Sequence, residues 1–253
     1  MGGAIAKAVL GVLSRSDVLV CDTDESKASA VGGTVADAHR IASECDYIVT
    51  AVKPQVLRSA LSEIKDELSA RSQKPVIVTP AAGIKIADVD EMAGGGFPII
   101  RIMPNTPVSV GLGMIQYVCN ADVTQSMLDG FIGFMSKAGM LDRTDEGKID
   151  AASAVSGCGP AFMYMFAEAL ADAGVECGLA RDKAIIYALQ MLRGSSELAL
   201  RSGKPLSVLK DEVCSPGGTT IRGVHALEKG GMRGAVMDAV KAAFEYNAQL
   251  GKK

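Results

Sequence analysis

The chain has 253 residues with a formal net charge of −3 and no run of basic residues, which disfavours nucleic acid or an anionic membrane as a partner and favours a small molecule. No apolar stretch reaches the roughly 18 residues that a membrane span needs, and the N-terminus lacks the charged and apolar regions of a signal peptide, so we expect a cytoplasmic protein. Its six cysteines lie far apart, with no CxxC pair, and we expect them to be small hydrophobes rather than disulfides or metal ligands.

The chain begins with a helical pattern that has two glycines at its start. Apolar residues at helical spacing follow Gly2 and Gly3, which predicts a helix over 3–14. In a dinucleotide-binding turn, the glycines of the GxGxxG motif end a strand, let the backbone approach the pyrophosphate and open a helix whose N-terminus attracts the anion. If Gly2 is the third glycine of this motif, the first strand and the first two glycines are not in this chain. We expect a true start further upstream, the alternative being a fragment with impaired cofactor binding.

The next strand, predicted over 18–21, ends at an acidic residue. Asp22 lies 20 residues after Gly2, where the dinucleotide fingerprint places an acid that binds the adenosine ribose. Glycine-rich helix starts and strand-end aspartates are also common without a cofactor. The pair of matches is therefore a hypothesis that the rest of the chain must support.

Short apolar runs alternate with amphipathic helical patterns up to about residue 145, which is typical of βαβ units and a parallel sheet. Further strands are predicted over 47–52, 76–79, 99–103, 112–119 and 139–142, and helices over 24–31, 34–44, 54–69, 84–93 and 123–137. From about residue 148 the strand signals stop, and helices are predicted over 151–176, 181–202, 218–229 and 232–250, with a short turn near 205–212. We expect an α/β dinucleotide-binding domain over 1–148 and an all-α domain over 149–253.

Two predicted strands end in proline-containing turns at the edge where a cofactor would lie. In Thr50-Ala51-Val52-Lys53-Pro54, Lys53 and its backbone are candidates to line the adenosine or nicotinamide side; alternatively Lys53 is solvated and Pro54 only starts a helix. In Arg101-Ile102-Met103-Pro104-Asn105-Thr106-Pro107, two prolines stiffen the turn and hold Asn105 in one orientation. That suits the positioning of a planar ring, and a rigid connection between domains is the alternative.

The most informative stretch is Cys214-Ser215-Pro216-Gly217-Gly218-Thr219-Thr220, before a predicted helix. Two glycines without Cβ atoms and two hydroxyls at a helix start direct several backbone N–H groups one way, which predicts a site for a small anion such as a carboxylate. A plain N-cap needs only one Ser or Thr, so the whole run favours a binding turn over simple capping.

Four motifs in order resemble the pyrroline-5-carboxylate reductase family over nearly all 253 residues. They are Thr-Ala-Val-Lys-Pro, Met-Pro-Asn-Thr-Pro, Val155-Ser156-Gly157-Cys158-Gly159-Pro160-Ala161 and the very specific Cys-Ser-Pro-Gly-Gly-Thr-Thr. The resemblance implies an oxidoreductase that reduces 1-pyrroline-5-carboxylate to L-proline with NADPH or NADH, the last step of proline biosynthesis. It also implies an N-terminal Rossmann domain and a C-terminal helical domain whose long helices interlock with a second subunit, in homodimers that sometimes assemble into decamers.

The resemblance implies roles for individual residues as well. The C-terminal turn would hold the substrate carboxylate, with Val213 against the ring and the hydroxyl of Thr220, the expected catalytic residue, near the substrate nitrogen. The substrate-binding residues are Val213, Ser215, Gly217, Gly218, Thr219 and Thr220. The cofactor-binding residues are Gly2, Gly3, Asp22, Ala51, Val52, Lys53, Pro54 and Asn105. No metal site is implied.

The chain departs from the family pattern in three places. The front of the glycine motif is missing, which puts cofactor affinity in doubt. Cys158 stands where Ser is more usual, a near-isosteric change that we interpret as packing. Asp22-Thr23-Asp24-Glu25 follows the second strand of the motif, where NADPH users need cationic or hydroxyl groups for the 2′-phosphate. Three carboxylates repel that phosphate, so the electrostatics favour NADH while the family favours NADPH.

The implied chemistry needs orientation rather than a nucleophile or a metal, because a protonated cyclic imine is already a good hydride acceptor. One alternative is a dehydrogenase of the 3-hydroxyacid type, which wants a helix-borne Lys near an alcohol. The helix predicted from residue 151 has no Lys in its first turns. A second alternative is a non-catalytic chain that dimerises through its helical domain but binds cofactor too weakly for turnover.

Overall fold

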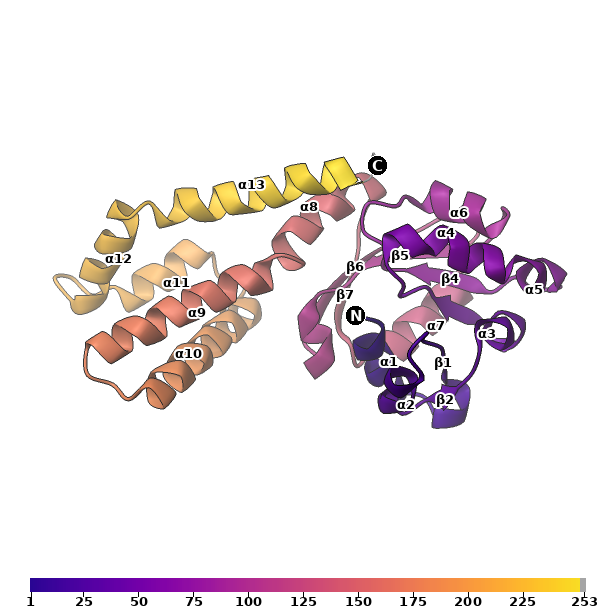
Figure 1. The fold of residues 1–253 in the computed structure, drawn as a ribbon. Coiled ribbons are helices and arrows are strands. Elements are labelled where there is room, and N and C mark those ends of the chain that lie inside the picture. Colours follow the sequence, from indigo (N-terminus) through magenta and orange to yellow (C-terminus); the bar gives the residue numbers. More distant parts are fainter. Residues whose placement is uncertain (251–253) are drawn as a thin grey trace. The chain divides into compact units, whose positions relative to one another are not determined.

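The computed structural model describes residues 1–250, and it contains two compact units (Figure 1). Unit 1 consists of Met1–Cys158 together with the end of the last helix from Ala243, and unit 2 consists of Gly159–Ala242. The units therefore divide ten residues later than the boundary predicted between 148 and 149. The helix over Glu146–Ser156 belongs to unit 1 because a buried charge attaches it to the sheet, as described below.

Unit 1 contains a five-stranded sheet in the order β3-β4-β5-β6-β7. Its strands are β3 (Tyr47–Val49), β4 (Val76–Thr79), β5 (Ile99–Met103), β6 (Gly113–Cys119) and β7 (Gly139–Arg143). Strands β3, β4 and β5 are parallel, as predicted, but β6 is antiparallel to β5. The connection between β5 and β6 holds only the short 3-10 helix η2 (Thr106–Val110), and a parallel crossover needs a dozen or more residues. Strand β7 is parallel to β6, since a full helix joins them.

A second, two-stranded parallel sheet is formed by β1 (Leu19–Val20) and β2 (Thr34–Val35). From the sequence we expected one parallel sheet without its first strand, and in the structure β1 and β3 lie in separate sheets. The strand β2 was not predicted. The helix expected over 34–44 begins only at Ala38, because Asp37 caps it by accepting a hydrogen bond from the Arg40 N–H.

Helices pack on both faces of the larger sheet (Figure 1). The helices of unit 1 are α1 (Gly2–Leu10), α2 (Glu25–Val31), α3 (Ala38–Glu44), α4 (Pro54–Glu63), α5 (Lys65–Ala70), α6 (Ile86–Ala93), α7 (Gln125–Met135) and α8 (Glu146–Ser156); a short 3-10 helix, η1 (Arg15–Asp17), precedes β1. One core cluster joins α4 and α6 to the sheet through Leu57 and Val89, and a second joins α1 and α7 through Ile5 and Phe131. This layering leaves the strand ends available for a ligand.

Unit 2 is helical, as predicted, but it buries few apolar side chains. Its helices are α9 (Gly159–Glu176), α10 (Arg181–Ser202), α11 (Leu206–Val213), α12 (Thr219–Lys229) and α13 (Met232–Leu250), the last of which ends in unit 1. Helices α9 and α10 lie side by side (Figure 1), and the buried hydrophobic residues within 159–242 are the alanines Ala167, Ala171, Ala184 and Ala188. None of the described helices combines the length and the apolar character needed to cross a membrane.

Two glycines meet where β6 and β7 pair, and they provide a test of the fold. Gly139 has a φ of +137° and lies opposite Gly113 in the strand register. A Cβ atom at Gly139 would collide with the backbone of Gly113. Gly139→Ala should therefore lower the free energy of unfolding, measured with urea, by at least about 3 kcal/mol.

Gly133→Ala is the matched control, because residue 133 lies in α7 and a Cβ atom there meets nothing within 4 Å. We expect this change to stabilise the helix by up to about 1 kcal/mol. Equal urea midpoints for the two variants would contradict the close approach of β6 and β7.

Candidate active site

The N-terminus of α1 packs against the end of β3. A Cβ atom on Gly2 would lie 2.7 Å from the Cβ of Ala51, and one on Gly3 would lie 3.6 Å from Val31. The first turn of α1 has no acidic residue and no side-chain cap, and within residues 1–250 no hydrogen bond is made to the amides of Gly2 and Gly3. Only glycine fits at residue 2, and the open amides are suited to an anion. The residues present therefore fit the pyrophosphate of a dinucleotide.

The residues after β3 lie beside this helix end. Thr50 is buried, and its N–H continues the strand pairing by donating to the carbonyl of Val78 at 2.9 Å. Ala51, Val52 and Lys53 are exposed. Lys53 is the N-cap of α4, and Pro54 is its first residue. Pro54 therefore starts a helix, as the alternative interpretation of this turn expected. Ala51 through Pro54 also lie at the strand end that we expected to face a cofactor.

The end of β1 carries a fixed carboxylate. Asp22 Oδ1 accepts a hydrogen bond from the N–H of Asp24 at 3.0 Å, and Asp24 caps α2 by accepting from the N–H of Ser26 at 3.1 Å. Burial raises the pKa of the Cys21 thiol, and the negative charges of Asp37 and Asp22 raise it further. The end of the small sheet is therefore a region of negative potential.

The side chain of Asn105 is held by hydrogen bonds inside unit 1. It is buried, its Nδ2 donates to the carbonyl of Ser156 at 2.9 Å, and its Oδ1 accepts from the N–H of Met114 at 2.9 Å. Ser156 Oγ also donates to Gln116 Oε1 at 3.1 Å. Both ends of the amide are therefore used inside the protein, and the side chain ties the end of β5 to β6 and α8.

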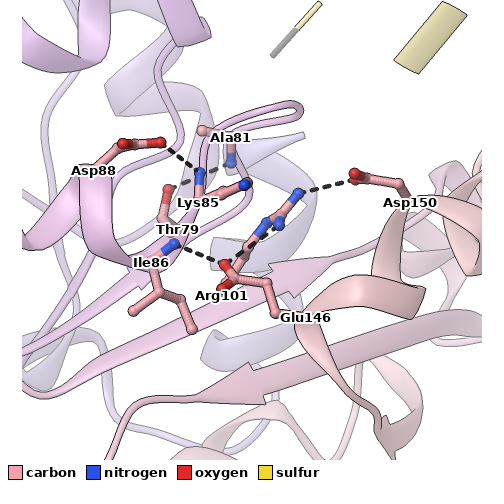
Figure 2. Close-up of polar contacts among 8 residues, drawn as sticks. All are labelled: Thr79, Ala81, Lys85, Ile86, Asp88, Arg101, Glu146 and Asp150. Carbon is pink, nitrogen blue, oxygen red and sulfur yellow. Dashed lines mark hydrogen bonds and ion pairs between the residues drawn. The ribbon is translucent and has the colours of Figure 1, made fainter. Parts of the chain in front are cut away.

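A buried ion-pair cluster under α8 was missed from the sequence. Figure 2 shows Arg101 reaching from β5 toward Glu146 and Asp150 on α8, at 3.5 Å from Glu146 Oε1 and 3.0 Å from Asp150 Oδ1. Arg101 is only 2% exposed, and its Nε has no hydrogen-bond partner. Glu146 Oε1 also accepts from the N–H of Ile86 at 2.7 Å. The signal for this cluster is a single charge inside the apolar strand 99–103, since a buried charge needs partners.

The C-terminal turn joins α11 to α12. The N–H of Gly218 donates to the carbonyl of Ser215 at 3.0 Å, and a Cβ atom on Gly218 would collide with Ser215 Oγ. Gly217 has a φ of +69°, which favours glycine. Val213 ends α11 and is 64% exposed.

The turn leaves the start of α12 open. The helix has Gly218 as N-cap, no side-chain cap and no acidic residue in its first turn. Thr219 and Thr220 are exposed, and in the described part of the chain nothing hydrogen-bonds to their amides or hydroxyls. The turn therefore presents donors for a small anion. The six predicted substrate residues lie together in unit 2, and the predicted cofactor residues lie in unit 1.

Comparisons with known proteins match both units. A family model described as pyrroline-5-carboxylate reductase dimerisation matches residues 146–250, and one described as NADP oxidoreductase coenzyme F420-dependent matches residues 1–83. The pyrroline-5-carboxylate reductase of Arabidopsis thaliana is 39% identical over 98% of this chain and 86% of its own length. That of Escherichia coli is 36% identical over 99% of this chain and 96% of its own. The crystal structure of Plasmodium falciparum pyrroline carboxylate reductase with NADP bound is 33% identical, with a TM-score of 0.87 over 99% of this chain and 94% of that one.

The cluster in Figure 2 provides a test of how α8 is held. In Asp150→Asn, Arg101 keeps only the more distant carboxylate of Glu146, so the free energy of unfolding in urea should fall by about 1–3 kcal/mol. Lys148→Ala changes a charge on the same helix, but Lys148 is 75% exposed and pairs with Asp145 at the surface. We expect less than about 0.5 kcal/mol for this control. If the two variants unfold alike, the cluster does not anchor α8.

Proposed function

The chain belongs to the pyrroline-5-carboxylate reductase family, and on that premise we propose that it reduces 1-pyrroline-5-carboxylate to L-proline by hydride transfer from NAD(P)H, the last step of proline biosynthesis. The observation that carries the proposal is that similarity to these reductases covers 98% of the chain, including both the strand ends of unit 1 and the turn of unit 2. The chain is then an oxidoreductase with a Rossmann-like domain. The reducing equivalent comes from the reduced nicotinamide of the bound cofactor.

In unit 1, the open amides of Gly2 and Gly3 would hold the pyrophosphate. Asp22 would accept from a ribose hydroxyl, and Ala51 through Pro54 would line the same edge. Asn105 contributes as a positioning residue, because its side chain holds the strand end in place.

In unit 2, the open backbone N–H groups of the turn, those of Thr219 and Thr220 among them, would bind the substrate carboxylate, and Val213 would contact the ring. Pinning the carboxylate fixes which face of the imine is attacked. Hydride transfer needs the donor carbon about 3–3.5 Å from the imine carbon, so orientation supplies much of the catalysis. Thr220 would place its hydroxyl near the imine nitrogen. An indispensable general acid is not required, since the protonated imine is already electrophilic.

The exposed apolar side chains of unit 2 support a second copy of this chain as partner. Only alanines are fully buried among its hydrophobic residues, whereas several large side chains on its helices are at least 55% exposed. They include Met165, Ile186, Tyr187, Leu198, Leu200 and Met237. Burying this surface in a homodimer would supply the core that unit 2 lacks, and a decamer would need further contacts between dimers. All six cysteines are free thiols, which supports a cytoplasmic location.

The 3-hydroxyacid alternative has less support. The helix predicted from residue 151 was expected to have no Lys in its first turns. In the structure this region is α8, which begins at Glu146 and carries Lys148 in its first turn. Its side chain is 75% exposed and lies 3.1 Å from the carboxylate of Asp145, and α9 has no Lys. Steady-state assays should show NAD(P)H oxidation with 1-pyrroline-5-carboxylate and no NAD(P)⁺ reduction with 3-hydroxyacids. The reverse pattern would overturn the proposed reaction.

Replacing the hydroxyl of Thr220 tests the substrate turn. Thr220→Ala should lower kcat/KM for 1-pyrroline-5-carboxylate roughly 10- to 100-fold, because a donor near the imine nitrogen is lost, while the thermal midpoint changes little. Thr220→Ser keeps the hydroxyl and should recover most of the activity. Ser207→Ala removes an exposed hydroxyl from α11 and serves as the control. Unchanged turnover in Thr220→Ala would remove this role from the residue.

A further inference from the structure

NADH and NADPH differ only at the adenosine ribose, where NADPH carries a 2′-phosphate in place of a hydroxyl. A hydroxyl donates a hydrogen bond to a carboxylate, whereas a phosphate is an anion that needs cationic or other donors. The residues that follow β1 in this chain therefore decide which of the two cofactors is accepted, if the proposed function is correct.

The segment after β1 is acidic and holds no cation. Asp22-Thr23-Asp24-Glu25 contains three carboxylates, and no Lys or Arg occurs between Arg15 and Lys27. Both of these basic side chains are already engaged. Arg15 Nε donates to the carbonyl of Gly33 at 3.3 Å, and Lys27 Nζ lies 3.4 Å from Asp24 Oδ2. On the neighbouring α3, Arg40 Nε lies 3.1 Å from Glu44.

The carboxylate of Asp22 is held in one orientation. Its Oδ1 accepts the N–H of Asp24, and within the described chain its Oδ2 has no hydrogen-bond donor. One oxygen is therefore fixed by the turn, and the other is left to accept from a ribose hydroxyl. Asp24 cannot rotate away without uncapping α2, since it accepts from both the N–H and the hydroxyl of Ser26. The turn thus keeps two negative charges at the strand end.

The next strand adds a further charge at the same end of the small sheet. Asp37 follows β2 and caps α3 by accepting from the N–H of Arg40 at 2.7 Å. The Cys21 thiol experiences these charges: burial is the main cause of its raised pKa, and Asp37 and Asp22 are the next largest. The same negative potential would repel an incoming phosphate dianion but would not repel a neutral hydroxyl.

We infer that Asp22, supported by the acidic turn after β1, makes this chain select NADH over NADPH. The inference rests on the proposed function for the location of the ribose. It concerns residues of this chain and not the reaction, so binding can test it without turnover.

The test is a direct titration of the full chain with NADH and with NADPH, followed by calorimetry or by the fluorescence of the reduced nicotinamide. The chain has no Trp, so protein fluorescence contributes little to this signal. We expect NADH to bind about 10- to 100-fold more tightly than NADPH. The ratio should shrink as salt is raised, because salt screens the repulsion of the phosphate.

Asp22→Ser removes the charge and offers a hydroxyl to the phosphate. It should tighten NADPH and weaken NADH, so that the ratio of the two dissociation constants falls at least about tenfold. Asp17→Ser removes the same charge from the exposed 3-10 helix before β1 and should leave the ratio unchanged.

The inference would be overturned if the wild-type protein binds NADPH as tightly as NADH, or if it binds neither. It would also be overturned if the ratio of the two dissociation constants is unchanged in Asp22→Ser. Turnover with 1-pyrroline-5-carboxylate is measured separately with each cofactor. A chain that selects NADH but does not reduce the imine would leave the inference standing and would contradict the proposed function.

Discussion

The pairing of one buried charge organises the first unit. Arg101 lies in the middle of a sheet whose neighbouring side chains are apolar, and a guanidinium cannot be left there without carboxylates. Glu146 and Asp150 stand one helical turn apart on α8, so both reach the same guanidinium. At its other end, α8 is tied to the sheet by Ser156, which contacts Asn105 and Gln116. The helix is thus attached at both ends, and the turn after β5 between these attachments has little freedom.

The helix starts at the proposed ligand sites are of two kinds. Helices α2 and α3 are capped by Asp24 and Asp37, whose carboxylates satisfy the first amides and repel other anions. Helices α1 and α12 have no side-chain cap and no acidic residue in the first turn. Each open start has glycine where another part of the chain comes close. The proposed pyrophosphate and carboxylate sites are at the open starts, and the proposed ribose site is beside a closed one.

Unit 2 shows how little a set of helices can bury by itself. Helices α9 and α10 pack through small residues, Ala167 and Ala171 on one and Ala184 and Ala188 on the other, which brings their backbones together but buries little apolar area. Several larger apolar side chains on these helices remain exposed, Met165, Ile186 and Tyr187 among them. A chain with this distribution gains its hydrophobic stabilisation through association, which agrees with the dimerisation family model that covers the region.

Local pattern by itself determined the strands at 76–79 and 99–103, the helix at 181–202 and the geometry of the C-terminal turn, because periodicity, prolines and glycines act over a few residues. Only the tertiary structure decided what lies far apart in the chain. Arg101 meets partners 45 and 49 residues away, and the amide of Asn105 is used by residues 9 and 51 positions distant. The direction of β6 follows from a short connection rather than from its own residues. Periodicity indicates which face of an element is apolar, but it does not indicate which distant group will pair with a buried charge or amide.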